Sequence, residues 1–153
     1  MRRKDRERDR EFGLAVIDSC EYGTMAIQGE EPYCLPLSLV RVGEELYFHC
    51  ALEGKKLDLL RANPAVWVSF VGENVAATDD FTTYFRSAMV RGTATEVTDP
   101  EEKLAALRAL CQKLTPAHIS AFDSEVARSF AVTGVWRIHI DEITAKEKKR
   151  PMK

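Results

Sequence analysis

The pattern that most limits the folds open to this chain is a run of short strands joined by tight turns. Residues 33–41, YCLPLSLVR, alternate between two faces, which is the period of a strand. The segment 42–44, VGE, predicts a turn, and residues 45–50, ELYFHC, predict a returning strand. A short strand over 24–28 and a turn over 29–32 precede them. Strands joined by turns this short pair in antiparallel fashion.

Three more strands are expected in the second half of the chain. The first is apolar on both faces, which favours a central strand with Trp67 in the core. The polar residues 72–80 after it are expected to form a loop. Gly92 is a candidate bulge in the long second strand. Trp136, on the third strand, is also expected in the core. The predicted strands are 65–71, 82–97 and 133–143.

Helices are predicted where the period changes to three or four residues. Residues 12–20 have this spacing, and residues 54–63 predict a short helix that Pro64 ends. Asp99 followed by Pro100 is a strong helix start, because an N-cap precedes a proline at the first helical position. The same signal recurs at residues 115–116.

The order of elements predicts the fold class. The predicted order is a helix, three strands, a short helix, two strands, two helices and a last strand. In this order, most consecutive strands are joined by hairpins. This order favours an antiparallel barrel with helices outside it over a doubly wound sheet. The chain of 153 residues suggests one domain. We therefore predict a single mainly β domain over 1–153, with a charged helix start at 1–11 and a basic frayed tail at 147–153.

Composition argues against several classes of protein. The net charge of −2 indicates neither a nucleic-acid partner nor a membrane surface. The first residues, MRRKDRERDREF, mix both charge signs and lack the apolar segment of a signal peptide. No apolar run approaches the ~20 residues of a transmembrane helix. A cytoplasmic protein is therefore expected.

The cysteines and histidines do not predict a metal site. None of the cysteines is paired as C-x-x-C, and the three histidines are scattered. We expect reduced thiols that pack as small hydrophobic groups. The cysteines are Cys20, Cys34, Cys50 and Cys111.

The segment 48–56, FHCALEGKK, carries the clearest functional signal. A strand runs into small residues, and a helix begins beside two lysines. A helix N-terminus offers free N–H groups and a positive dipole end, and lysine binds phosphate well. Ala51 and Gly54 allow an anion to approach the backbone. This predicts a phosphate site with Lys55 and Lys56, although two solvated lysines on a first helical turn are the simpler alternative.

Longer stretches of the chain resemble a known family. The segments EEPYCLPLSLVR, ELYFHCALEGKKLDLLRANPAV and DDFTTYFRSAMVRGTATEV are similar to those of the pyridoxamine 5′-phosphate oxidase-related split-barrel flavoproteins, nearest to the nitroimidazole-resistance-like branch. The resemblance spans about residues 12–146. It implies a six-stranded antiparallel split β-barrel and a homodimer with two FMN sites at its interface.

The resemblance also implies which residues hold the cofactor. Lys56, with Lys55 beside it, is expected to bind the phosphate, and the segment 36–38 to run along the isoalloxazine. Residues of the segment FTTYFRS are expected to approach the cofactor across the dimer interface. The implied cofactor-binding residues are Pro36, Leu37, Ser38, His49, Cys50, Ala51, Lys55, Lys56, Thr83, Tyr84 and Ser87.

His49 is the residue that the resemblance implies is catalytic. It matches a histidine that lies near the flavin and acts on the substrate, and imidazole can donate a proton near neutral pH. A hydrogen-bonded histidine at a strand end is the alternative. Two features depart from the family: Ala145 replaces a common glycine, and the chain lacks the C-terminal Arg-x-His type of motif of true pyridoxamine phosphate oxidases.

The function expected from these features is FMN-dependent reduction of a small, flat, electron-poor molecule. Two alternatives stay open from the sequence. One is a module that holds flavin or haem without turnover, and the other is a reductase that uses a deazaflavin. The substrate and the electron donor are not determined by the sequence.

Overall fold

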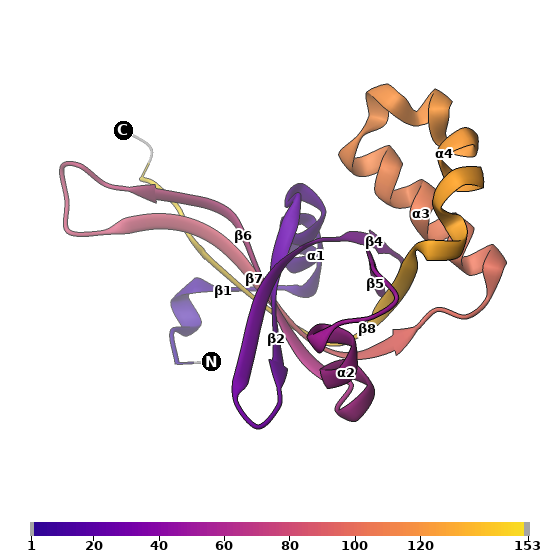
Figure 1. Cartoon of the computed structure of the whole chain (residues 1–153). Helices are drawn as coiled ribbons and strands as arrows, with labels where there is room; N and C mark the ends of the chain where they lie inside the picture. Colours follow the sequence, from indigo (N-terminus) through magenta and orange to yellow (C-terminus); the bar gives the residue numbers. More distant parts are fainter. Residues whose placement is uncertain (1, 152–153) are drawn as a thin grey trace.

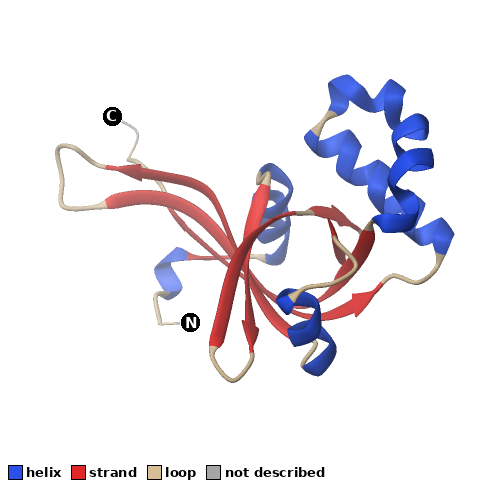
Figure 2. Ribbon diagram, in the orientation of Figure 1, coloured by secondary structure: helices blue, strands red, loops and turns tan. Residues whose placement is uncertain are grey.

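One curled antiparallel sheet dominates the computed structural model, which describes residues 2–151 (Figure 1). Helices lie outside the sheet (Figure 2). The strands are β1 (Glu7–Arg8), β2 (Tyr22–Gln28), β3 (Pro32–Ser38), β4 (Val40–Val42), β5 (Glu45–Cys50), β6 (Ala65–Ala76), β7 (Thr83–Glu96) and β8 (Gly134–Lys148). The α-helices are α1 (Arg10–Ser19), α2 (Lys55–Ala62), α3 (Pro100–Leu114) and α4 (Phe122–Ser129), and the 3-10 turns are η1 (Lys4–Arg6), η2 (Pro116–Ala121) and η3 (Phe130–Val132).

The strand order explains why the barrel is split. Across the sheet it is β3-β2-β6-β7-β8-β5-β4, with β1 paired to β8. The two edge strands, β3 and β4, are separated in the chain only by Leu39, so one extended segment passes from one edge to the other. Counting that segment once and leaving out the two-residue β1 gives six long strands. The predicted six-stranded antiparallel split barrel is therefore confirmed.

The barrel interior contains the main hydrophobic core. Val66, Val68 and Phe70 point inward from alternate positions of β6, and each is at most 1% exposed. From α1, Val16 and Ile17 are buried in the same cluster. Burial of these apolar side chains is the main force that curls the sheet around them.

A second, smaller core lies on the outer face of β4, β5 and β8, beneath α3. Tyr47 and Val135 from the strands meet Ala106 and Leu110 from α3. The helix begins as predicted, because the Asp99 side chain accepts hydrogen bonds from the first backbone N–H groups. α4 contacts chiefly η2 and η3. None of the helices in residues 2–151 has the length and apolar composition needed to cross a membrane.

No helix of residues 2–151 covers the outer face of β2, β3, β6 and β7 in this way, and we call it the open face. Trp67 is 41% exposed, Val71 60% and Met89 43%. β6 is central, as predicted, but the expectation that Trp67 lies in the core is wrong. Strand side chains alternate, and since Val66 and Val68 occupy the interior, Trp67 must point outward.

The two chain ends differ from the sequence prediction. Residues 1–11 were expected to start a helix, but α1 begins only at Arg10, capped by Asp9. The residues before it form η1 and β1, because Arg8 donates to the buried carboxylate of Glu147 at 2.9 Å. β8 continues to Lys148, so the start of the predicted frayed tail is a strand. Residues 1, 152 and 153 lie outside the described part.

The expected loop at 72–80 is largely strand. β6 continues to Ala76 and pairs with β7 after an irregularity next to Gly72. The result is a two-stranded arm that projects from the barrel, on the side opposite α3 and α4 (Figure 1). The polar composition was misleading, because residues 72–76 are exposed on both sides of the strand and yet pair with β7 through cross-strand hydrogen bonds.

Gly92 lies at a β-bulge, as predicted, and its substitution tests how tightly β7 and β8 pack there. The register of the two strands shifts between Arg91 and Gly92. A Cβ at position 92 would lie 2.5 Å from the backbone oxygen of His139. We expect Gly92→Ala to lower the free energy of unfolding in urea by about 1–3 kcal/mol, the usual cost of overpacking.

Gly29→Ala is the control for this substitution. Its Cβ would meet the tip of the Leu59 side chain at 2.7 Å, and that tip can rotate away. An equal loss of stability in both variants would contradict the bulge assignment.

Tyr47 predicts a loss of stability at high pH. Its hydroxyl donates to Glu102 at 3.0 Å, and burial, then Glu102, raises the pKa of Tyr47 to about 12. Because the folded pKa lies above the ordinary value near 10, this stabilisation is complete below about pH 10 and is lost as pH rises to about 12. The Tm difference between wild type and Tyr47→Phe should therefore shrink over that range.

Tyr22→Phe is the matched control, because Tyr22 is 61% exposed. Its Tm should follow the wild type from pH 9 to 12. If Tyr47→Phe keeps the wild-type alkaline decline, the Glu102 contact is not its cause.

Candidate functional site

The corner between β5 and α2 has the local structure that a phosphate site needs. β5 ends at Cys50 and α2 begins at Lys55, within a residue of the predicted bounds. Gly54 is the N-cap, with φ at +132°, a conformation that side chains disfavour. No side chain caps this helix. Its first N–H groups and the positive end of its dipole are therefore left for another acceptor.

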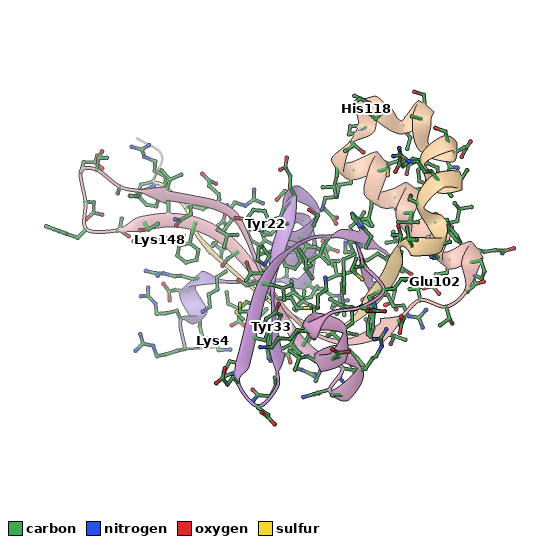
Figure 3. All side chains as sticks on the ribbon, in the orientation of Figure 1. Lys4, Tyr22, Tyr33, Glu102, His118 and Lys148 are labelled. Atoms are coloured by element: carbon green, nitrogen blue, oxygen red, sulfur yellow. The ribbon has the colours of Figure 1, made fainter. Side chains whose placement is uncertain are left out.

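The two lysines at this corner face different surroundings. Lys55 Nζ lies 5.2 Å from the ring centre of Tyr33, which Figure 3 shows beside α2, and Lys56 Nζ lies 5.0 Å from that of Phe48. Lysine ion pairs in the described chain involve Lys4 and Lys149, so neither corner lysine has one. Lys55 shares a cleft with two acidic residues, Glu30 and Glu31. Lys56 lies outside that cleft.

The opening of the barrel lies next to this corner. β4 pairs with β5 only from Val42 opposite Glu45 to Val40 opposite Tyr47, and β3 pairs only with β2. Beyond Tyr47, the β3-facing edge of β5 and the outer edge of β3 keep unpaired backbone groups.

Pro36 and Ser38 flank this opening. Pro36 lies on an edge strand, as its missing N–H predicted. Continuing the register past Val40 and Tyr47 would set Ser38 opposite His49. The structure thus gathers the segment 36–38, His49, Cys50 and the α2 corner around one opening.

His49 points to the outer face of the barrel, as Tyr47 does. It is exposed and lines a cavity of about 330 Å³ beneath α3 and α4. His139 is hydrogen-bonded to Glu45, whereas within residues 2–151 the His49 imidazole has no such partner. The structure therefore gives His49 no protein partner of the kind that the strand-end alternative assumed. His118 lies at the far end of the helical region (Figure 3).

Cys50 and Ala51 pack closely against the start of β8. A Cβ on Gly134 would lie 3.0 Å from the Ala51 oxygen and 3.2 Å from the Cys50 sulfur. Burial raises the pKa of the Cys50 thiol, and Lys56 opposes that rise only in part. Cys50 is therefore a protonated packing group at neutral pH rather than a thiolate.

Three predicted residues lie elsewhere in the protomer. Thr83, Tyr84 and Ser87 belong to the arm strand β7, where Ser87 pairs with Val71 and Lys146. Tyr84 lines a separate cleft of about 390 Å³ near the end of β8. A single copy of the chain does not bring these residues to the α2 corner.

The sequence reasoning missed two features of the site. The first is the exposed apolar row on the open face, for which the double-faced apolar run at 65–71 was the available signal. The second is the wall that α3 adds beside His49, with Leu107 and Cys111. The available signal was the apolar spacing of residues 107, 110, 111 and 114 along one side of α3.

Comparisons with known proteins agree with this architecture. A family model described as pyridoxamine 5′-phosphate oxidase matches residues 9–147. The comparison with curated proteins gives no match.

Solved structures with the same fold have low sequence identity. The flavocytochrome Anf3 from Azotobacter vinelandii has a TM-score of 0.79 at 23% identity, covering 99% of this chain and 73% of that one. An FAD and haem binding protein from Mycobacterium smegmatis has a TM-score of 0.76 at 24% identity, covering 95% of this chain and 74% of that one. A candidate 5-nitroimidazole antibiotic resistance protein from Bacteroides thetaiotaomicron VPI-5482 has a TM-score of 0.74 at 24% identity, covering 91% of this chain and 84% of that one.

The family model covers nearly the whole chain, whereas the similar structures establish the fold alone. The split barrel and the open strand edges agree with the resemblance seen in the sequence. This chain therefore belongs to the pyridoxamine 5′-phosphate oxidase family.

Proposed function

We propose that this protein is an FMN-dependent oxidoreductase. The observation that carries the proposal is the opening between β3 and β5, with unpaired strand edges on two sides and the uncapped start of α2 at one end. A flat cofactor with a polar edge and a phosphate tail fits these groups. Bound FMN would supply the redox chemistry, and the protein would supply anchoring and orientation.

Different residues around the opening bind the phosphate and the ring system of the cofactor. Lys56, the first N–H groups of α2 and, more weakly, Lys55 hold the phosphate. The backbone of Pro36, Leu37 and Ser38 hydrogen-bonds the polar edge of the ring system. Ala51 and the Cys50 backbone flank the phosphate.

His49 is the residue proposed to act on the substrate. It lies on the outer face, beside the opening, with its imidazole free to orient a small, electron-poor molecule or to give it a proton.

A second copy of the chain completes the proposed site. The open face carries a large exposed apolar area, which is unusual for a surface that remains in water. A C2 dimer formed through it would bring Thr83, Tyr84 and Ser87 of the partner copy to the cofactor. The free thiols are consistent with a reducing compartment such as the cytoplasm.

The dimer is tested by placing a charge on the open face. Trp67→Glu should convert a dimer to a monomer in size-exclusion chromatography with light scattering and should weaken retention of flavin. Val42→Glu is the matched control, because Val42 is 50% exposed on β4, and it should stay dimeric. A dimer that survives Trp67→Glu would place the interface elsewhere.

The absorption spectrum of the purified protein tests the cofactor. After FMN is added and the protein is desalted, we expect retained flavin bands in the near-ultraviolet and blue. A Lys55→Ala, Lys56→Ala double variant should lose them. A wild-type protein that releases FMN completely would refute the proposal.

Haem is the second candidate, because two similar structures are named as a flavocytochrome and as an FAD and haem binding protein. A Soret band after haem addition, lost on His49→Ala, would favour haem ligated by His49. Retention of a deazaflavin in preference to FMN would instead favour the third alternative.

A further inference from the structure

The cavity beneath α3 and α4 has one apolar wall. That wall comes from α3, and its side chains are Leu107, Leu110, Cys111 and Leu114. The volume of about 330 Å³ lies at the lower end of the range of about 300–1,000 Å³ for small-molecule sites. A neighbouring cavity of about 270 Å³ shares Cys111, so there is additional room on that side.

The polar groups that line the same cavity present acceptors rather than donors. The Thr133 hydroxyl donates to the Ser129 backbone oxygen at 2.9 Å, and the Ser129 hydroxyl donates to that of Glu125 at 2.8 Å. Thr115 likewise donates to the Cys111 oxygen at 3.2 Å. A hydroxyl has one proton and two lone pairs, so each offers a lone pair to a ligand.

The remaining polar groups fit this pattern. The Glu125 carboxylate is acceptor-only and binds Arg128 through Oε2, which leaves Oε1. His49 can donate or accept, depending on its tautomer. A ligand without a hydrogen-bond donor would cover the half-buried hydroxyl oxygens of Ser129 and Thr133 without pairing them, and unpaired acceptors that lose water disfavour binding.

The geometry points to a binding pocket for an apolar ring compound that carries an O–H or N–H donor at one edge, such as a phenol or an aromatic amine. Its apolar body packs on α3, and its donor edge meets the acceptors of α4 and of residues 129–133. The pocket's walls come from this chain alone. The pocket is a site separate from the proposed reduction of an electron-poor molecule, and it does not rest on the proposed function.

Cys111 provides a direct readout of occupancy. Cys111 is half-buried in the apolar wall, whereas Cys34 lies on the open face of the sheet, outside the pocket lining. The alkylation rate of Cys34, fast or slow, therefore serves as an internal control. Iodoacetamide labelling of the full-length protein, resolved by peptide mass spectrometry, gives both rates in one sample. With 2-naphthol at about ten times its Kd, Cys111 alkylation should slow about tenfold by mass action, and Cys34 alkylation should not change.

A matched compound tests the donor requirement. 2-Methoxynaphthalene has the same rings without the O–H, and it should protect Cys111 much less. Thr133→Val removes one acceptor while keeping the shape, and it should weaken 2-naphthol protection about fivefold. Equal protection by both compounds would overturn the donor assignment.

Filling the cavity tests its location. Leu107→Trp should abolish protection, whereas Leu104→Trp should not, because Leu104 lies on the same helix but outside the lining. Thermal melting of both variants checks that they fold. Protection that survives in Leu107→Trp would overturn the assignment of the site.

The same labelling separates the pocket from the proposed flavin chemistry. Protection should be the same in flavin-loaded and flavin-free protein, since no cofactor group forms a wall. Loss of protection on removing flavin would overturn the pocket as drawn. Failure of FMN retention with intact protection would refute the proposed function and leave the pocket standing.

Discussion

Replacing Lys56 with Ala should lower the affinity for FMN about ten- to a hundredfold. The reason is that a hydrogen bond to a charged group contributes about 1.5–3 kcal/mol, and Lys56, unlike Lys55, lies outside the cleft of Glu30 and Glu31. Quenching of FMN fluorescence on titration with flavin-free protein measures the Kd. Because a phosphate contact is electrostatic, the difference in Kd between the wild type and the Lys56→Ala variant should become smaller at high salt.

Lys55→Ala is the matched control on the same helical turn. Its effect should be smaller, because Glu30 and Glu31 share the cleft with Lys55 and partly neutralise it. Lys56→Arg should keep most of the affinity, since it keeps the charge. If Lys55→Ala lowers the affinity for FMN more than Lys56→Ala does, the phosphate lies next to Lys55 instead.

Replacing His49 with Ala should leave FMN affinity unchanged and lower turnover about a hundredfold or more. General acid catalysis contributes about 10²–10⁴-fold, and the exposed His49 imidazole has no partner in the described structure that would compete for its proton. The electron donor need not be known. Flavin reduced anaerobically with dithionite can be mixed with a nitro-heterocycle and its reoxidation followed by stopped flow.

His139→Ala is the control for this experiment. His139 lies on the paired strand, but its imidazole is hydrogen-bonded to Glu45 at 2.8 Å, and the pKa of His139 is raised by that contact. The reduced flavin in the His139→Ala variant should be reoxidised at the wild-type rate. Wild-type reoxidation in His49→Ala would remove His49 from the chemistry and leave it as a wall of the cavity.

Much of the site corner could be predicted because its signals are local. The helix over 55–62 is bounded by Gly54 and Asn63, and both bounds follow from backbone preferences of neighbouring residues. β5 occupies residues 45–50, as alternation and the flanking turns indicated. Pro36 could be assigned to an edge because proline lacks the N–H that an interior strand requires.

The errors occurred where two partners distant in sequence decide the outcome. Trp67 was expected in the core, but α1, far away in sequence, packs on the other face of β6, which carries Val66 and Val68, so Trp67 points outward. Residues 72–76 look like a loop in composition, yet pairing with β7 makes them a strand. Arg8 becomes part of a strand pair because Glu147, far along the chain, accepts its hydrogen bond.

By itself, the sequence determined the hairpin connections and the helix that starts beside two lysines, since each depends on residues within a turn or a strand of one another. It also marked Gly92 as a bulge position, because glycine tolerates such backbone where other residues do not. Only the tertiary structure decided which lysine shares a cleft with acidic residues, which face of the sheet stays uncovered and that His49 borders a cavity walled by α3. These properties depend on which surfaces meet across the barrel, and packing of distant side chains, rather than local backbone preference, sets them.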